Sequence, residues 1–197
     1  MNLRDARKWC AAAHGKQGYG YTSIDDGGMD GAHPYSFHLR EVERVALRFG
    51  FRDSSIRKAC WGHDVLEDTK KKIRDLISAG FTPYEVALMF AVTDGKGKTR
   101  YLRKLVAYRR IRKTPGAIIV KLCDRIANVE HAMLTSYTRK YELYKREMRS
   151  FERHLRDRND AVVAAMWEHL TWLFTDEAKC TMWSTLNCCH DPKGRVA

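Results

Sequence analysis

Apolar residues recur at intervals of three and four along almost the whole chain, and this period is the strongest constraint on the fold. The pattern is typical of helices with one buried face. Alternating runs of β-branched residues are scarce, and there are only four prolines. The sequence therefore predicts an all-α fold. A chain of 197 residues has the length of one compact domain, so we expect a single helical bundle.

Start and stop signals divide this pattern into helices. Thr82-Pro83-Tyr84-Glu85 is a capping box with proline at the first helical position, and Gly50 follows an apolar-periodic segment as a stop. A glycine-rich stretch at residues 18–31 is long enough to be a functional loop, and we expect it to close over a ligand as a lid. Helices are expected at about residues 3–14, 35–49, 54–68, 72–79, 83–92, 100–114, 117–129, 134–155 and 161–174.

The long segment from Leu134 to Leu155 has one apolar seam and a highly charged back. Such a seam either packs within the domain or pairs two copies of the chain. We favour packing within the domain, and both a monomer and a homodimer remain open.

Charge and cysteine usage bound the setting of the protein. The 36 Lys and Arg residues exceed the 24 Asp and Glu residues, and the formal net charge of +12 favours anionic partners. No apolar run approaches the roughly 18 residues of a membrane span, and the charged start lacks the apolar region of a signal peptide. We therefore expect a cytoplasmic protein that does not contact membranes. Its cysteines are expected to be free thiols, because Cys188-Cys189-His190 matches no standard zinc spacing.

Four clusters place polar residues where helical periodicity favours apolar ones. Each also has a structural interpretation, as a hydrogen-bonded core histidine or as the solvated side of an amphipathic helix. Imidazoles and carboxylates together suit a divalent transition metal, and a cation would offset carboxylates late in a helix. The clusters are His38; His63, Asp64, Glu67 and Asp68; Lys121, Asp124, Arg125 and Asn128; and the basic group Lys96, Lys98, Arg100, Arg103 and Lys104.

The order of these clusters along the chain resembles that of the HD-domain metal phosphohydrolases. The similarity is greatest to the hydrolase domain of the RelA/SpoT enzymes and to the small alarmone hydrolases, and it covers roughly residues 5–135. It implies an HD-type helical core at about residues 3–135, completed by helices at about 137–178 and followed by a short tail. The matching segments are AAHGKQ (12–17), PYSFH (34–38), GHDVLEDT (62–69), VTD (92–94) and IVKLCDRIANV (119–129).

The resemblance also implies roles for individual residues. Glu67 and Asp68 match the catalytic acidic pair, and Asn128 matches a residue that contacts the ribose or phosphate of the substrate. Lys121 and Arg125 align with charged residues of the same helix, and we count them as candidate substrate-binding residues that could also be structural. One divalent metal, manganese with iron or zinc as alternatives, would be held by His38, His63, Asp64 and Asp124.

Tyr19 occupies the position at which the family carries a basic residue that packs against guanine. An aromatic ring at this position predicts stacking on a purine with little preference for one base. We therefore expect metal-dependent hydrolysis of a phosphoester or diphosphate group on a purine nucleotide, as in removal of the 3′-pyrophosphate of (p)ppGpp, the alarmone of the stringent response.

Two other functions remain open. The same fold could act on another nucleotide, such as a deoxynucleoside triphosphate, a cyclic nucleotide or the 2′-phosphate of NADPH. It could also be a catalytically vestigial, basic nucleic-acid-binding protein, for which the footprint would be Arg109, Arg110, Arg112 and Lys113.

Overall fold

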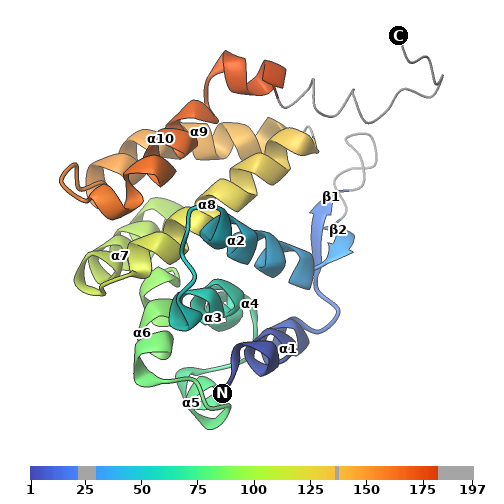
Figure 1. The fold of residues 1–197 in the computed structure, drawn as a ribbon. Coiled ribbons are helices and arrows are strands. Elements are labelled where there is room, and N and C mark those ends of the chain that lie inside the picture. Colours follow the sequence, from blue (N-terminus) through green and yellow to red (C-terminus); the bar gives the residue numbers. More distant parts are fainter. Residues whose placement is uncertain (22–29, 136–137, 182–197) are drawn as a thin grey trace.

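The structure is a computed structural model that describes residues 1–21, 30–135 and 138–181 of the chain. Helices make up most of it, as the sequence predicts (Figure 1). Three parts of the sequence prediction lie outside the described residues: the centre of the glycine-rich lid, Tyr137 of the expected helix 134–155, and the segment Cys188-Cys189-His190. The elements are α1 (Leu3–His14), β1 (Gly18–Tyr21), β2 (Asp30–Pro34), α2 (Ser36–Arg48), α3 (Ser54–Gly62), α4 (Val65–Asp68), α5 (Ile73–Ser78), α6 (Pro83–Val92), α7 (Arg100–Lys113), α8 (Ala117–Leu134), α9 (Thr138–Leu155), the 3₁₀ helix η1 (Ala161–Val163) and α10 (Ala164–Trp172).

Local signals in the sequence fix several helix ends. The predicted capping box opens α6: the Thr82 side chain accepts the Glu85 N–H, and the Glu85 carboxylate accepts the Thr82 N–H. Gly50, with φ of 85°, follows α2 in the left-handed conformation that glycine adopts without strain. Asp53 caps α3 by accepting the N–H groups of residues 55 and 56.

Three features differ from the prediction. The expected helix 54–68 is interrupted at His63 and Asp64, between α3 and α4. Leu134 ends α8 and is 41% exposed, so it does not belong to the seam of α9. The two ends of the glycine-rich stretch pair as an antiparallel ribbon, with Gly18 opposite Pro34 and Tyr19 opposite His33. Such a short ribbon carries little periodic signal, because strands of four and five residues show at most two alternations.

Helix α8 is the central element of the bundle. It crosses the middle of the molecule, with α1, α3, α5 and α6 on one side and α9 and α10 on the other (Figure 1). It packs against α2, α3, α6 and α9. Its apolar side chains Leu122 and Ile126 are fully buried, as are Leu39 and Val42 of α2. Each such burial stabilises the fold by about 1.5–3 kcal/mol, so the α2–α8 contact holds both helices in fixed register.

The seam of α9 packs inside the bundle, as we favoured. Tyr141, Tyr144, Phe151 and Leu155 are buried on its inner face, and the Phe151 ring centroid lies 5.2 Å from that of Trp167 in α10. Whether the protein is a monomer or a homodimer stays a prediction. Among the residues that the structure describes, none belongs to a helix with the length and apolar character needed to cross a membrane.

Candidate functional site

Two imidazoles and two carboxylates meet where α2, the α3–α4 junction and α8 come together. The Nε2 atoms of His38 and His63 lie 3.3 Å apart. Asp124 Oδ1 lies 3.5 Å from His38 Nε2 and 3.6 Å from His63 Nε2. Asp64 Oδ2 lies 3.6 Å and 2.8 Å from the same two nitrogens. The structure therefore brings together all four residues that the sequence proposed as metal ligands.

The cluster has the nitrogen and oxygen donors of a cation site. His63 Nδ1 lies 2.8 Å from the Cys60 carbonyl oxygen, and because a carbonyl only accepts, Nδ1 carries the hydrogen. Nε2 of a neutral His63 then presents its lone pair to the cluster. His38 Nε2 faces that nitrogen, and both rings are almost fully buried. Two imidazole nitrogens and a carboxylate oxygen this close together are a suitable donor set for a cation, so His38, His63 and Asp124 can hold a metal ion.

Without a cation in the cluster, the carboxylates shift the protonation of the imidazole. Burial opposes charge on His63, but Asp64 and Asp124 outweigh it and raise the pKa of His63 well above its usual value. Burial also opposes charge on the two aspartates, but His63 and Lys121 lower the pKa of Asp124 and the two histidines lower that of Asp64. The site therefore holds its carboxylates ionised.

The break between α3 and α4 aims the ligands. Gly62 ends α3 where it crosses α6, and a Cβ at Gly62 would lie 2.5 Å from the Met89 side chain. Glycine thus permits the close approach of the two helices. The chain turns at His63 and Asp64, which places His63 in the core and leaves Asp64 at the floor of a cavity.

A layer of hydrogen bonds orients the ligands. Lys121 Nζ donates to Asp124 Oδ2 at 2.9 Å, and Asn128 Nδ2 donates to Asp124 Oδ1 at 2.5 Å. The Tyr35 hydroxyl lies 2.6 Å from Asp64 Oδ2 and 2.9 Å from Asp68 Oδ2. Bonds of this kind hold metal-binding side chains in position.

Glu67 and Asp68 lie on the exposed side of α4, beside the cluster. Partial desolvation raises the pKa of Glu67 against the effect of the Asp94 N–H, which donates to Glu67 Oε2 at 2.9 Å. Partial desolvation and the Asp64 charge raise the pKa of Asp68. Raised pKa values suit carboxyl groups that exchange protons near neutral pH.

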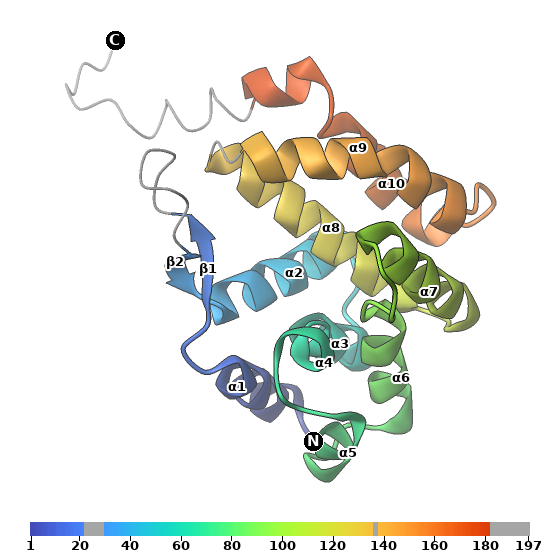
Figure 2. The same cartoon turned by 180° about the vertical axis from the view of Figure 1, so that it is seen from behind.

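These side chains line a cavity of about 490 Å³, a size typical of small-molecule sites. It opens between β1, α2, α4, α7, α8 and α9, and α4 lies on the near side of the bundle when the molecule is seen from behind (Figure 2). Its basic residues are Arg100, Lys104, Lys121 and Lys140. The cavity therefore combines the cluster of His38, His63, Asp64 and Asp124, which we call the metal cluster, with several basic side chains. This combination suits a phosphate ester.

Two predicted substrate-binding residues have other contacts. Arg125 lies outside the cavity lining: its guanidinium donates to Glu147 at 3.0 Å and lies over the Tyr144 ring at 4.3 Å. Tyr19 lines the cavity but is only 7% exposed. Its ring stacks on His38 with centroids 4.5 Å apart, and its hydroxyl donates to Asn128 Oδ1 at 3.1 Å. Lys140 Nζ lies over the ring, 5.3 Å from its centroid. Stacking of a base on Tyr19 stays a prediction.

Sequence reasoning missed three cavity residues. Tyr35 lies inside the PYSFH segment, but nothing in the pattern showed that its hydroxyl joins Asp64 to Asp68. Lys140 and Tyr144 come from α9, in the third of the chain that carries no recognised motif. Their spacing of four residues, which puts both on one helix face, is the signal that was present.

Comparison with known proteins supports the fold. No family model and no curated protein sequence matches the chain. A solved structure of a metazoan ortholog of SpoT, described as hydrolysing ppGpp and playing a role in starvation responses, matches with a TM-score of 0.68. The two chains share one fold. The match covers 87% of this chain and 93% of that one at 21% sequence identity. The predicted all-α bundle is therefore confirmed.

Proposed function

We propose that the protein is a metal-dependent hydrolase that removes a diphosphate from a purine nucleotide of the (p)ppGpp type. The observation that carries this proposal is the juxtaposition of the buried His38–His63–Asp124 cluster with the exposed carboxylates of Glu67 and Asp68 in one basic cavity. The metazoan protein of the same fold is described as hydrolysing ppGpp, which supports this substrate class.

His38, His63, Asp64 and Asp124 are the proposed metal ligands. Two imidazoles and two carboxylates leave coordination positions for water and substrate, as catalytic sites require. Manganese suits this mixed nitrogen and oxygen set, with iron and zinc as alternatives. A divalent ion held here supplies polarisation of a phosphoryl oxygen and a water of lowered pKa.

The chain's own residues bind the substrate and handle protons. Lys140 flanks the cavity and suits the phosphates of the substrate. Lys104 and Lys121 also line the cavity, but each is paired with a carboxylate, Asp94 at 3.0 Å and Asp124 at 2.9 Å. Glu67 and Asp68, with raised pKa values, can take a proton from the attacking water and return it to the leaving oxygen. Tyr35 fixes Asp68 relative to Asp64, so proton transfer occurs at a defined position.

The base and the cellular setting belong to the same proposal. Tyr19 offers a flat aromatic face without a charge, which predicts that adenine and guanine nucleotides are both accepted. Hydrolysis of another nucleotide, such as a deoxynucleoside triphosphate, a cyclic nucleotide or NADPH, is the alternative. We place the activity in the cytoplasm, where such nucleotides are abundant.

The test is release of pyrophosphate from ppGpp by the purified protein with added Mn²⁺. We expect activity that a chelator abolishes and that Mn²⁺ restores. Glu67→Gln keeps the shape of the side chain and should slow turnover by about 10² or more. Glu142→Gln, at an exposed position of α9, is the matched control and should not change the rate.

Two outcomes would contradict the proposal. The absence of any hydrolysis product, whether phosphate or pyrophosphate from ppGpp and the other nucleotides or a nucleoside monophosphate from a cyclic nucleotide, would leave the cavity without a hydrolase function. Turnover that survives removal of the metal would contradict the role of the cluster. Hydrolysis of a panel nucleotide in place of ppGpp would retain the enzyme class and change its substrate.

A further inference from the structure

A second and larger cavity lies at the other end of α8. Its volume is about 820 Å³, and it opens between the end of α7, the start of α8 and the chain from the end of α9 through η1. It shares no lining residue with the cavity of the metal cluster. Ile118 and Asp124 are six positions apart on α8, or about 9 Å along the helix axis. The two cavities are therefore separate sites on one helix.

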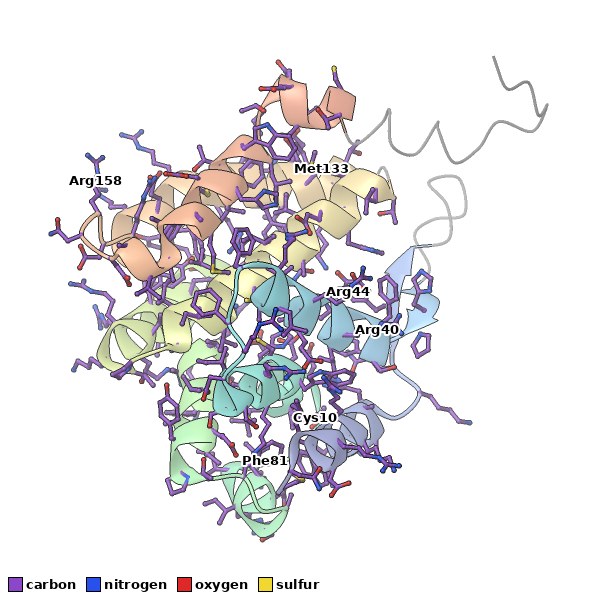
Figure 3. The ribbon with its side chains drawn as sticks, in the orientation of Figure 1. Cys10, Arg40, Arg44, Phe81, Met133 and Arg158 are labelled. Atoms are coloured by element: carbon purple, nitrogen blue, oxygen red, sulfur yellow. The ribbon has the colours of Figure 1, made fainter. Side chains whose placement is uncertain are left out.

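The rim of this second cavity is cationic. It carries Arg112, Arg153, Arg156 and Arg158, and Arg158 projects from the loop after α9 (Figure 3). Arg156 pairs with Glu152 at 2.6 Å. Within the described part of the chain, no side chain forms a hydrogen bond or ion pair with the guanidinium groups of Arg112, Arg153 and Arg158.

The two acidic residues of the rim are engaged with their own loop. Asp157 Oδ1 accepts the Asn159 N–H at 2.9 Å, and Asp160 Oδ1 accepts the Val162 N–H at 3.0 Å. They form turns and make no ion pair with Arg112, Arg153 or Arg158, although their two charges reduce the positive potential of the rim. Three unpaired guanidinium groups at one concave rim suit a ligand with several phosphates, because the planar fork of arginine binds phosphate oxygens in pairs.

The floor of the cavity is apolar and ends at a helix start. Ile118 and Ile119 are only partly buried, and Val162 is 67% exposed. Gly116, with φ of 82°, is the N-cap residue of α8, and as a glycine it has no side chain with which to cap this helix of 18 residues. The N–H groups of Ala117 and Ile119 donate to the carbonyl oxygens of Thr114 and Gly116, so it is the positive end of the helix dipole that adds to the field of the arginines.

We propose that this cavity binds a nucleoside polyphosphate at a site distinct from the metal cluster. The phosphates lie on Arg112, Arg153 and Arg158, and the base lies on the apolar floor at Ile118 and Val162. The volume lies in the range of small-molecule sites, and a flat apolar body is what the floor selects. An extended nucleic acid needs a basic stripe along the surface, whereas these arginines surround one concavity. The proposal does not depend on the proposed hydrolase function.

The experiment is a titration of the wild-type protein with GTP, followed by NMR of isotope-labelled Ile, Leu and Val methyl groups. We expect saturable shifts at Ile118, Ile119 and Val162. Methyl groups of Val65 and Leu66, beside the metal cluster, report separately on binding in the first cavity. Inorganic tripolyphosphate should bind at least about tenfold more weakly than GTP, because it has no group to cover the floor.

Paired substitutions test the arginines. Arg153→Ala with Arg158→Ala should weaken GTP binding at the second cavity about tenfold or more, because each removes charge-assisted hydrogen bonds. The control pair is Arg139→Ala with Arg149→Ala, which removes the same charge from exposed positions of α9 outside both cavities. This pair should leave the affinity of the second cavity for GTP unchanged. All four side chains are exposed, and the wild-type titration needs no variant.

Several results would overturn the proposal. One is the absence of saturable shifts at Ile118, Ile119 and Val162. Another is equal weakening by the control pair, which would mean general charge attraction. Tripolyphosphate binding as tightly as GTP would show a simple anion site. Shifts of the same methyl groups by a single-stranded RNA oligonucleotide at lower concentration than GTP would show a nucleic-acid surface.

Discussion

Replacement of Lys121 by methionine tests how the metal cluster is held in the core. Lys121 is 6% exposed and Asp124 is 9% exposed, and the ammonium donates to the carboxylate at 2.9 Å. Burial opposes charge on both groups, but each stabilises the charged form of the other, so the pKa of Lys121 is raised and that of Asp124 is lowered. The pair is therefore ionised at neutral pH, and Lys121→Met leaves a buried carboxylate without its cation.

Removing one partner of a buried ion pair costs about 3–5 kcal/mol, which is a large part of the roughly 5–15 kcal/mol stability of a typical domain. His63 Nε2 also faces Asp124, at 3.6 Å, and offsets part of the loss. We therefore expect about 3 kcal/mol in the metal-free protein. With an m value near 2 kcal/mol/M, the urea midpoint should fall by about 1.5 M.

The assay is urea unfolding at pH 7 with a chelator present, followed by far-UV circular dichroism. Arg44→Met is the matched control. Arg44 pairs with Glu41 at 3.2 Å but is 70% exposed on α2 (Figure 3). An exposed pair contributes less than about 1 kcal/mol, so this variant should unfold close to the wild type.

A double variant distinguishes an uncompensated charge from a loss of packing. Lys121→Met combined with Asp124→Asn removes both charges, and should recover most of the stability that Lys121→Met loses. If the double variant is no more stable than the single one, the loss comes from packing and not from an uncompensated charge. A single variant within 1 kcal/mol of the wild type, a span of about fivefold in the folding equilibrium, would also refute the argument.

Four further predictions concern the cluster and the core around it. Asp64→Ala should lose the bound metal, and full metal stoichiometry after gel filtration would contradict its role as a ligand. Asp68→Asn should keep the metal and slow hydrolysis by about 10² or more, so near wild-type turnover would remove it from the catalytic pair. Tyr35→Phe should lower kcat about tenfold with KM unchanged, through loss of a hydrogen bond to a charged group; an equal rise in KM would instead indicate contact with substrate. Burial opposes charge on Glu43, but hydrogen bonds from Arg7, Trp61 and Arg57 lower its pKa below 4.5. The ionised carboxylate therefore stabilises the fold above the pKa that Glu43 has in the unfolded chain. This contribution is lost as the pH falls through the lower pKa that Glu43 has in the folded protein. Urea midpoints of the wild type and Glu43→Gln should therefore differ at pH 7 and converge below about pH 4.5, and a constant difference would contradict this.

Helical periodicity predicted which faces are buried, and this is why His38 was placed correctly. A residue four positions before Val42 and seven before Val45 must share their face in a regular helix. The same rule failed at His63 and Asp64, where it extended one helix through a turn. The break lies where α3 packs against α6, a contact between distant segments that local spacing does not encode.

On α8, the angle between residues around the helix explains which polar side chains contact Asp124. At about 100° per residue, Asn128 lies about 40° from Asp124 round the helix, whereas Arg125 lies about 100° away. Asn128 accordingly bonds to Asp124, and Arg125 turns toward Glu147 of α9. Sequence reasoning grouped the four polar residues together because it did not know where α9 would lie. Lys140 and Tyr144 were missed for the same reason.

The energetics of the cluster favour the proposed enzyme over the alternative of a vestigial binding protein. His38 and His63 are nearly inaccessible, and two carboxylates face them within the core of the bundle. Apolar replacement of buried charged groups is often neutral or stabilising by about 1–4 kcal/mol, so a fold gains no stability from such a group. A surface that binds phosphates needs only the exposed arginines and lysines, which lie elsewhere on α7 and α9. Without a metal, His63 and the Lys121 ammonium offset part of the cost of this cluster. A bound cation would offset more of it, and a cation at this position suits the proposed chemistry of a phosphate ester.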